Sequence, residues 1–382
     1  MGSVKYLGYY DTAENAQENR GYTLSATNKM TYICSAMNEI GYNVEILSTS
    51  TTGNKKRYPG KEVQIFEGTK LRLFPSLRSG NKLQRIAKVF LNQCHAFFFL
   101  LRNTKRGEPV LVYHSLGYAK MVVLARRLKG FRLILEAEEI YADVSGNERD
   151  RKRERRVFEA ADSYIFSTEM LNEQINIHRK PYVVIHGTYQ VERDRDVRFS
   201  DDEKEITHCV YAGTLDPRKG GGMAAAAAAY LPDSYHMHIL GFGSKEDKQH
   251  LQEHIVQIKH AGGNITYDGQ LSGEEYIRFL QSCDIGLSTQ NPDAAFNATS
   301  FPSKILSYMA NGLQVVSIRI PAIEKSAIGP YLHYYEHQTP EEIAKAILAV
   351  DVTDGSNPRE VIADLNRGFV KELKVLMQND KC

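Results

Sequence analysis

The feature that most constrains the fold of this chain is a pair of short apolar runs separated by a polar loop and the start of a helix. Ile285–Ser288 and residues 314–317 have the composition of buried strands, and residues 303–310 have that of the helix between them. A strand, a helix and a further strand in close succession are typical of an α/β domain. We therefore expect this segment to lie in such a domain.

The predicted helix start has the features of an anion-binding site. Thr299 and Ser300 are expected to cap the helix, and Pro302 suits its first turn. Lys304 adds a positive charge where backbone N–H groups point outward without partners, and a helix end of this kind binds phosphate. An ordinary capped helix in an α/β domain is the alternative that the same residues allow.

A glycine-rich turn, KGGG at residues 219–222, follows a predicted strand and opens an alanine-rich helix at residues 224–229. Glycine lets the backbone approach a pyrophosphate, and the helix N-terminus favours its charge. A dinucleotide-binding motif needs G-x-G-x-x-G with an acidic residue about twenty positions later. Residues 241–243 supply only two of those glycines, so the sequence favours a diphosphate ligand over a dinucleotide such as NAD.

Length and composition exclude several classes of protein. The chain has 382 residues, enough for two domains of ordinary size, and its net charge of +2 gives no sign of a nucleic-acid partner. The five cysteines are scattered and lack CxxC spacing, so neither a disulfide framework nor a zinc site is expected. Because no signal peptide and no apolar run of about eighteen residues is present, a reducing cytoplasm is the expected location.

The first half of the chain alternates predicted strands and helices. Residues 4–10 and 44–48 are expected to be strands, and residues 27–40 the helix between them, closed by Gly41. This order is typical of the opening of a parallel, doubly wound sheet. Four more strands are expected in the same half, at residues 110–114, 132–137, 163–167 and 183–185.

Two groups of histidines are candidates for a functional role. His250 and His254 have the i, i+4 spacing of helical metal ligands, but no glutamate is placed as in H-E-x-x-H, so a solvated helix face is expected there. His114 ends a buried strand, and ligands of open α/β sheets bind beyond the carboxyl ends of strands. A buried histidine with satisfied hydrogen bonds is the alternative for His114.

Four segments of the second half form an ordered set of motifs: VYAGTLDPRKG (210–220), HILGFGS (238–244), YDGQLSGEEYIRFLQSCDIGLS (267–288) and FPSKILSYMANGLQVVS (301–317). In order and spacing they resemble the motifs of retaining glycosyltransferases with the two-lobed GT-B fold, a family 4-like group also called glycosyl transferases group 1. The resemblance is close over roughly residues 205–320 and loose in the first half. It implies two Rossmann-like, doubly wound domains that face a central cleft. It also implies transfer of a sugar from a nucleotide diphosphate sugar to a hydroxyl with retained configuration.

The resemblance also sets the expected domain boundaries. An acceptor-binding domain is expected at residues 1–186, a polar linker at 187–206 and a nucleotide-sugar-binding domain at 207–355. A helix within residues 356–382 is expected to cross back to the first domain, as the tails of GT-B enzymes do.

Two departures from the family pattern bear on the donor. Many members carry two glutamates eight positions apart, near the sugar and the nucleotide ribose, and the matching positions here are Thr299 and Ser307. Thr214 replaces the arginine of the family's G-R-L motif, although Arg218 beside Lys219 offers a charge nearby. A hydroxyl hydrogen-bonds a ribose more weakly than a carboxylate does, because charge-assisted hydrogen bonds are stronger. A degenerate, non-catalytic partner subunit of a transferase is therefore an alternative, as is a nucleotide-sugar epimerase of the same fold.

The resemblance implies a set of site residues. His114, Lys219 and Lys304 are the expected catalytic residues, with the lysines offsetting charge on the leaving diphosphate so that no metal or other cofactor is required. The acceptor is expected to contact Arg20 and either Glu138 or Glu139, with a surface loop and solvated glutamates as the alternatives. The donor, a UDP-sugar or a GDP-sugar, is expected to contact Gly21, Arg218, Gly241, Gly243, Thr299, Ser300, Ser303 and Ser307.

A basic and aromatic segment in the first half indicates contact with a membrane. Residues 82–106 interleave lysine and arginine with phenylalanine and leucine, a mixture that lies in the interface of anionic bilayers. We expect a lipid-linked saccharide acceptor in cell-surface polysaccharide synthesis, and peripheral contact with the inner face of the cell membrane. A helix with one face in the core and basic ends in water is the alternative. The basic residues are Lys82, Arg85, Lys88, Arg102, Lys105 and Arg106.

Overall fold

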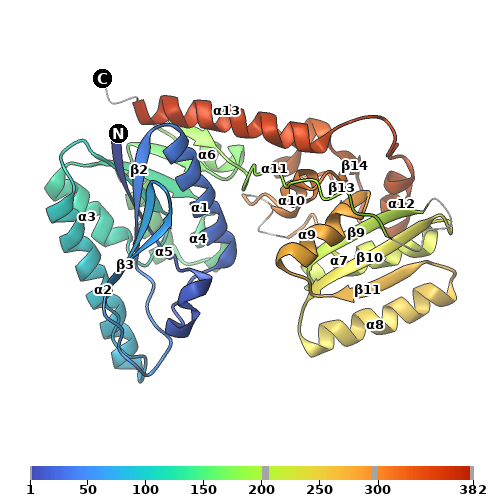
Figure 1. Ribbon diagram of the computed structural model, residues 1–382, viewed down its shortest axis with the longest axis horizontal. Coiled ribbons are helices and arrows are strands. Elements are labelled where there is room, and N and C mark those ends of the chain that lie inside the picture. The colour runs from blue at the N-terminus through green and yellow to red at the C-terminus, as the bar shows by residue number, and fades with distance from the viewer. Residues whose placement is uncertain (1, 200–205, 295–296, 298, 379–382) are drawn as a thin grey trace. The chain divides into compact units, whose positions relative to one another are not determined.

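The computed structural model describes residues 2–199, 206–294, 297 and 299–378, and it divides the chain into two compact units (Figure 1). Unit 1 contains the chain up to Thr188 together with its end from Gly368, and unit 2 runs from Tyr189 to Arg367. Part of the predicted linker at 187–206 lies outside the described residues. Each unit is a mostly or wholly parallel sheet with helices, so the predicted α/β class is confirmed.

Unit 1 contains an eight-stranded sheet in the order β3-β4-β2-β1-β5-β6-β7-β8, parallel except for the β3–β4 pair. Its central strands are almost wholly buried on both faces, as expected for parallel strands that helices cover on each side. The strands are β1 (Gly2–Gly8), β2 (Tyr42–Ser48), β3 (Lys61–Phe66), β4 (Thr69–Leu73), β5 (Pro109–Tyr113), β6 (Arg132–Ala137), β7 (Ser163–Phe166) and β8 (Tyr182–Val184).

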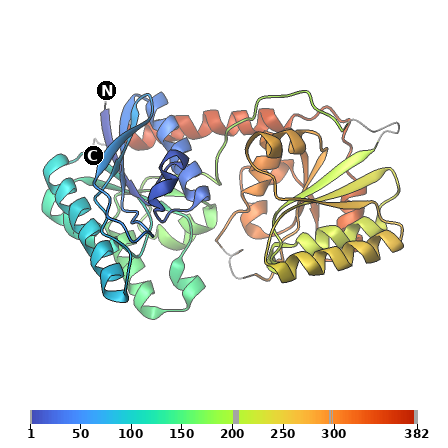
Figure 2. The ribbon, with the colours of Figure 1, turned by 60° about the horizontal axis from the view of Figure 1, so that its bottom comes forward.

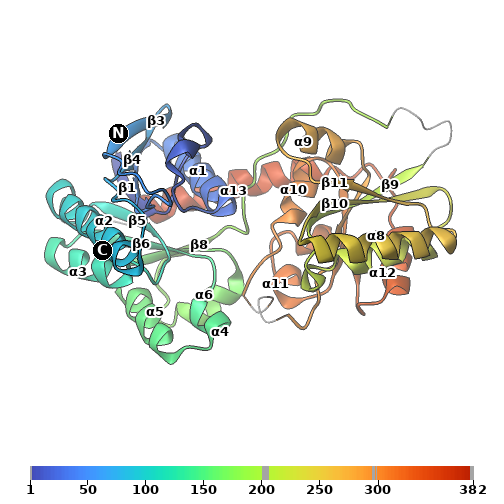
Figure 3. The same cartoon turned by 90° about the horizontal axis from the view of Figure 1, so that it is seen from below.

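The helices of unit 1 pack on the sheet in groups. Figure 3 shows α2, α3 and α5 side by side, and their apolar residues share one core cluster with β1, β5, β6 and β7. On α1 the ring of Tyr32 stacks on Phe369 of α13, with ring centroids 5.8 Å apart. The helices are α1 (Leu24–Glu39), α2 (Lys82–Asn103), α3 (Ala119–Lys129), α4 (Tyr141–Ser145), α5 (Glu148–Ala160) and α6 (Glu169–Ile175), with a 3-10 turn at Ala13–Glu18 and α13 (Pro358–Gln378) shared between the units.

The hairpin of β3 and β4 was not predicted from the sequence. Its turn is Glu67 and Gly68, and Gly68 has a φ of +76°, which suits glycine. Asn38 of α1 packs against this turn and donates a hydrogen bond to the Gly68 carbonyl oxygen at 3.0 Å. The alternation of apolar and charged residues along both strands was the signal that could have revealed them.

Unit 2 contains a six-stranded, all-parallel sheet in the order β11-β10-β9-β12-β13-β14. Figure 2 shows α7 and α8, in yellow-green and gold, lying together along one face of this sheet. The strands are β9 (Thr207–Thr214), β10 (Tyr235–Phe242), β11 (Ile265–Gly269), β12 (Ile285–Ser288), β13 (Gln314–Ile318) and β14 (His333–Tyr335). The helices are α7 (Gly221–Ala227), α8 (Lys245–His260), α9 (Gly273–Gln281), α10 (Lys304–Ala310), α11 (Pro321–Glu324) and α12 (Pro340–Leu348), with 3-10 turns at Pro217–Lys219, Ala228–Tyr230 and Gly329–Tyr331.

The predicted cap of α10 is wrong. The residue at the N-cap is Ser303, whose φ of −55° and ψ of −19° are helical, and its side chain makes no cap hydrogen bond. A capping side chain reaches the first-turn N–H groups from an extended backbone, which Ser303 lacks. The turn is closed instead by the main chain, because the Ile305 N–H donates to the Pro302 carbonyl oxygen at 3.1 Å. Thr299 and Ser300 lie farther upstream in the loop after β12.

Among the described helices, none combines the length and the apolar character that crossing a lipid bilayer requires.

Candidate functional site

The loops that follow β9, β10 and β12 are bound to one another at the carboxyl edge of the unit 2 sheet. The Leu215 N–H donates to the Phe242 carbonyl oxygen at 2.9 Å, which joins the loop after β9 to the end of β10. The Asn291 N–H donates to the Arg218 carbonyl oxygen at 3.0 Å, and the Thr289 hydroxyl donates to that of Gly220 at 2.8 Å. These three loops therefore form one continuous edge, the place where open α/β sheets bind ligands.

Two glycines make this close approach of loops sterically feasible. Gly220 has a φ of +85°, and a Cβ atom there would lie 1.6 Å from the Thr289 carbonyl oxygen. Gly241 has a φ of +153°, and its Cβ atom would lie 1.8 Å from the Gly213 carbonyl oxygen. No side chain fits at either position, so the predicted glycine turns set the shape of this edge.

Lys304 places a buried ammonium group at this edge. Its Nζ lies 3.7 Å from the centroid of the Tyr211 ring, and a Cβ atom on Gly213 would lie 3.0 Å from it. The residue is partly exposed as a whole, but Nζ itself is buried and has no hydrogen-bond partner within the described part of the chain. The face of the tyrosine ring offers a cation–π contact, which replaces only part of the lost hydration.

The pKa of Lys304 is lowered to near neutral pH by its surroundings. Burial, and then the nearby positive charge of Lys219, lower the pKa of Lys304 to about 7. The Tyr211 hydroxyl holds the Lys219 loop by donating to the Lys219 carbonyl oxygen at 3.0 Å. Two ammonium groups brought close together at a strand edge repel each other, and an anion bound there relieves that repulsion.

Arg218, predicted to help bind the donor, is held by a neighbouring carboxylate. Its guanidinium lies 2.6 Å from the Asp216 carboxylate, and 71% of its side chain is exposed. Hydrogen bonds from Arg218 hold the pKa of Asp216 at about 2. A donor contact by Arg218 stays a prediction. It requires the Arg218 guanidinium either to leave the Asp216 carboxylate or to bind this carboxylate and the donor at the same time.

The predicted hydroxyl and glycine contacts lie around the same edge but differ in exposure. Thr299 is buried, Ser300 and Gly243 are partly buried, and Ser303 is exposed. Ser307 lies on α10 and hydrogen-bonds the partly buried Tyr276 of α9, a contact that the sequence did not reveal. Their roles toward a donor stay predictions.

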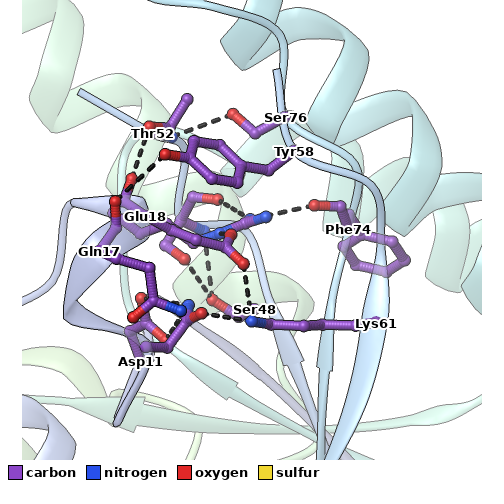
Figure 4. A network of polar contacts seen from close by, with 12 residues as sticks. Asp11, Gln17, Glu18, Ser48, Thr52, Tyr58, Lys61, Phe74 and Ser76 are labelled. Carbon is purple, nitrogen blue, oxygen red and sulfur yellow. Dashed lines mark hydrogen bonds and ion pairs between the residues drawn. The ribbon is translucent and has the colours of Figure 1, made fainter. Parts of the chain in front are cut away.

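Arg20, predicted to face the acceptor, is buried in a polar network in unit 1. Figure 4 shows Glu18, Lys61 and Phe74 of this network. Arg20 pairs with the Glu18 carboxylate at 2.7 Å and donates to the carbonyl oxygens of Ser50 and Phe74 at 3.1 and 3.0 Å. Lys61 of β3 reaches the same Glu18 at 2.6 Å. These contacts hold three loops together and give Arg20 a structural role, so an acceptor contact stays a prediction that the network does not favour.

Gly21, by contrast, is exposed beside this network. A Cβ atom there would meet nothing within 4 Å, and the following N-cap residue of α1, Thr23, makes no side-chain cap hydrogen bond. The space around Gly21 leaves room for a ligand, and its donor contact stays a prediction.

His114 has the surroundings of a core histidine. It follows β5, is 1% exposed, and packs between the rings of Tyr141 and Phe158 at centroid distances of 5.0 and 4.9 Å. Its Nε2 lies 3.5 Å from the Glu154 carboxylate. Burial lowers the pKa of His114 to about 4, so the ring is neutral at pH 7. A sugar contact stays a prediction, and the alternative of a buried, packed histidine fits these distances.

The predicted acceptor glutamates follow β6. Glu138 pairs with Lys29 of α1 at 2.5 Å, and Glu139 beside it is partly buried. Sequence reasoning favoured Glu138 or Glu139 over the neighbouring Glu136, which is fully buried next to the Tyr6 hydroxyl, and burial raises the pKa of Glu136 to about 8. A glutamate in an otherwise apolar strand was the sequence signal that could have singled out Glu136. The acceptor roles of Glu138 and Glu139 stay predictions.

The surface of α2 differs from the predicted basic face. Lys88, expected to meet headgroups, is buried and its ammonium donates to the Thr52 carbonyl oxygen. Leu83, Ile86 and Phe90 are exposed by 76%, 58% and 63%, and their i, i+3, i+7 spacing places them on one face. The second half of α2 instead packs into the core of unit 1.

Comparison with known protein families identifies one part of the chain. Residues 207–350 match the family model described as glycosyl transferases group 1. Over these residues the chain is similar to the glycosyl transferases group 1 family. The predicted resemblance is therefore confirmed for the part of unit 2 that carries Lys219 and Lys304. No curated protein sequence is significantly similar to the chain.

Solved structures share the fold of the whole chain at low sequence identity. A UDP-forming α,α-trehalose-phosphate synthase from Burkholderia xenovorans matches with a TM-score of 0.64 and 11% identity, covering 100% of both chains. Anabaena HepE in complex with UDP matches with a TM-score of 0.63 and 10% identity, covering 99% of this chain and 98% of its own. A trehalose-6-phosphate synthase used to study glycosyl transfer with retention matches with a TM-score of 0.62 and 11% identity, covering 99% and 98%. These likenesses establish the GT-B fold, as predicted.

Within residues 207–350, the structure adds Tyr211 to the residues found from the sequence. Its ring contacts the Lys304 ammonium and its hydroxyl fixes the Lys219 loop. Tyr211 lies in an apolar strand, where an aromatic residue is ordinary, so no sequence pattern distinguished it.

Proposed function

We propose that this protein is a glycosyltransferase that takes its sugar from a UDP-sugar, and that Lys219 and Lys304 hold the diphosphate. The observation that carries the proposal is the buried Lys304 ammonium, unpaired among the described residues and close to a second lysine, at the strand edge of a region similar to the glycosyl transferases group 1 family. A diphosphate supplies the missing charge and hydrogen-bond acceptors. The UDP complex of HepE and the UDP-forming synthase, which share the fold, support uridine over guanosine as the base.

Both lysines act on the leaving group in this proposal. As the bond between the anomeric carbon and the β-phosphate oxygen breaks, negative charge grows on that phosphate. Ammonium groups already in place stabilise this charge without reorganisation, which is usually the largest catalytic contribution. We propose that the two lysine charges take the place of a metal ion at the diphosphate.

The proposed stereochemical outcome is retention. The acceptor oxygen forms its bond to the anomeric carbon on the face from which the phosphate leaves, and the acceptor hydroxyl proton passes to the departing phosphate oxygen. No separate protein base is needed for this proton. The fold is shared with a trehalose-6-phosphate synthase that transfers with retention, which supports this proposal.

We further propose that the acceptor is a lipid-linked saccharide and that α2 contacts the membrane that carries it. The exposed face of Leu83, Ile86 and Phe90 is flanked by Lys82 and Arg85, which are also exposed. An apolar face bordered by cations inserts into the headgroup boundary of an anionic bilayer, where each cation contributes about 1 kcal/mol. Because Lys88 is buried, this surface is smaller than the sequence predicted.

A thermal-shift experiment with the full chain tests the donor proposal. UDP at 100 times its dissociation constant should stabilise the protein by about 2.7 kcal/mol and raise its Tm, whereas NAD should not. Lys304→Met should reduce the shift, while the control Lys345→Met, at an exposed position on α12, should retain it. Absence of a shift with both UDP and GDP at millimolar concentration would remove the donor site and favour a non-catalytic subunit. Conversion of a UDP-sugar to its epimer without transfer would favour an epimerase.

A further inference from the structure

Three histidines lie on one face of neighbouring strands in unit 2. His208 of β9 pairs with His236 of β10, and His238 follows two residues later, so its side chain points to the same face. On the other side of β10, His238 pairs with Thr266 of β11, and Asp268 follows that residue at the same two-residue spacing. The face of three adjacent parallel strands is thus polar where parallel sheets are usually apolar.

The ring nitrogens of these histidines converge. One nitrogen from each ring can be chosen so that all three lie within 4.8 Å of one another. The closest pair is His208 Nδ1 and His238 Nε2, at 2.9 Å. Nitrogens that share one tetrahedral Zn²⁺ with bonds of about 2.0–2.1 Å stand roughly 3.3 Å apart, so small ring rotations would give all three that separation.

The surrounding residues orient the rings as the partners of metal ligands do. The Asp268 carboxylate lies 3.2 Å from His238 Nδ1, which favours a proton on that nitrogen and leaves the Nε2 lone pair directed toward His208. The Thr266 hydroxyl lies 3.1 Å from His236 Nε2 and holds the third ring. A carboxylate behind a ligating histidine is the usual arrangement at zinc sites.

The cluster is enclosed by aromatic rings. Phe199 packs on His208 and His238 at centroid distances of 4.3 and 4.9 Å, and Phe279 of α9 meets His238 edge-on at 5.2 Å. His208 and His238 are buried. Enclosed and convergent imidazoles favour a borderline-soft cation.

We propose that His208, His236 and His238 bind a divalent transition-metal ion of the zinc class, with water in the fourth position. Imidazole nitrogens suit zinc, nickel and copper and select against magnesium and calcium. The ligands lie in the first residues of β9 and β10, whereas Lys219 and Lys304 lie beyond the carboxyl ends of the strands. The ion therefore crosslinks two strands and stabilises unit 2 without touching the proposed donor site.

The test is a calorimetric titration of untagged, chelator-treated full-length protein with Zn²⁺. The wild type should bind about one ion per chain, and His208→Ala and His238→Ala should each weaken binding by roughly 100-fold or more. Asp268→Asn, which leaves the ligands in place, should weaken it by about 10- to 100-fold. His250→Ala, on the exposed face of α8, is the control and should bind as the wild type does.

A second measurement is made on the wild type, so it does not depend on whether the histidine variants fold. Co²⁺ in a tetrahedral nitrogen site absorbs visible light far more strongly than six-coordinate Co²⁺, so the wild type loaded with Co²⁺ should show the intense tetrahedral spectrum. Zn²⁺ should displace the Co²⁺, abolish this spectrum and raise the Tm of the protein. A wild type that binds no Zn²⁺, or His208→Ala and His238→Ala variants that bind it unchanged, would overturn the proposal. Loss of the Co²⁺ spectrum in His250→Ala would do the same.

Discussion

Binding of UDP should weaken as the pH rises above 7, because Lys304 must be protonated to face the diphosphate. In the ligand-free protein, burial and then Lys219 lower the pKa of Lys304 to about 7. Above that pH the free protein carries a neutral amine, and binding has to take up a proton. A bound diphosphate restores the pKa of the ammonium toward its usual range, so the bound form remains protonated.

The size of the effect follows from the two protonation states. With a free pKa of about 7, the protein is half protonated at pH 7 and roughly 3% protonated at pH 8.5. The Kd for UDP should therefore rise by roughly 15-fold over this interval, or about 1.6 kcal/mol. Well above pH 7 the slope approaches a factor of ten in Kd per pH unit.

Calorimetry measures both the affinity and the proton. Titrations with UDP at pH 8 in buffers of different ionisation enthalpy should show uptake of about 0.9 proton per UDP bound. Lys304→Met should bind UDP more weakly at pH 7 and should lose the proton uptake, while Lys345→Met should behave as the wild type. An unchanged Kd between pH 7 and 8.5 in the wild type, or equal proton uptake in Lys304→Met, would refute the reasoning.

Three further predictions concern stability and the membrane. Lys304→Met should raise the Tm of the ligand-free protein at pH 6, because the folded wild type then carries a buried charge. The gain should shrink as the pH rises from 7 toward 10, because the folded wild type has lost this proton whereas the unfolded chain keeps it up to the ordinary lysine pKa. An equal gain at pH 6 and pH 9 would contradict this. Gly241→Ala should lower the free energy of unfolding by at least about 2 kcal/mol in denaturant titrations, because the added Cβ atom meets a carbonyl oxygen. In the control Gly222→Ala the added Cβ atom meets nothing within 4 Å, so the loss should be small. Equal losses in the two variants would argue against the steric cause. The double variant Lys82→Glu and Arg85→Glu should no longer sediment with anionic vesicles at low salt, but it should still bind UDP. Sedimentation equal to that of the wild type would exclude the α2 surface as the membrane contact.

Many strands of both sheets could be predicted because their signal is local, whereas β3, β4 and β14 were not predicted. Apolar runs such as Ile285–Ser288 and residues 132–137 coincide with β12 and β6, and the glycine turns at Gly220 and Gly241 are required by backbone geometry that a short sequence motif encodes. The β3–β4 hairpin was missed because its strands are only half-buried and carry charged residues on their open face.

The candidate site could be predicted only in part, because side-chain partners come from distant segments. Lys219 and Lys304 were found from motif positions, but the contact of Lys304 with Tyr211 joins residues 93 positions apart in the sequence. Arg20 was assigned to a ligand because an arginine in a loop gives no sign that Glu18 and two carbonyl oxygens will hold it. His208, His236 and His238 come together through strand pairing, and the H-M-H spacing of residues 236–238 was their only local signal.

The proposed function is tested most directly by release of UDP from UDP-sugars, measured on wild type and on Lys219→Ala and Lys304→Met variants. With a matching UDP-sugar, the wild type should release UDP, and each variant should be slower by roughly 10²-fold or more, as loss of a preorganised charge at the leaving group predicts. Full activity in both variants would show that the diphosphate lies elsewhere. A wild type that neither binds nor turns over any nucleotide sugar in the panel would contradict a glycosyltransferase altogether.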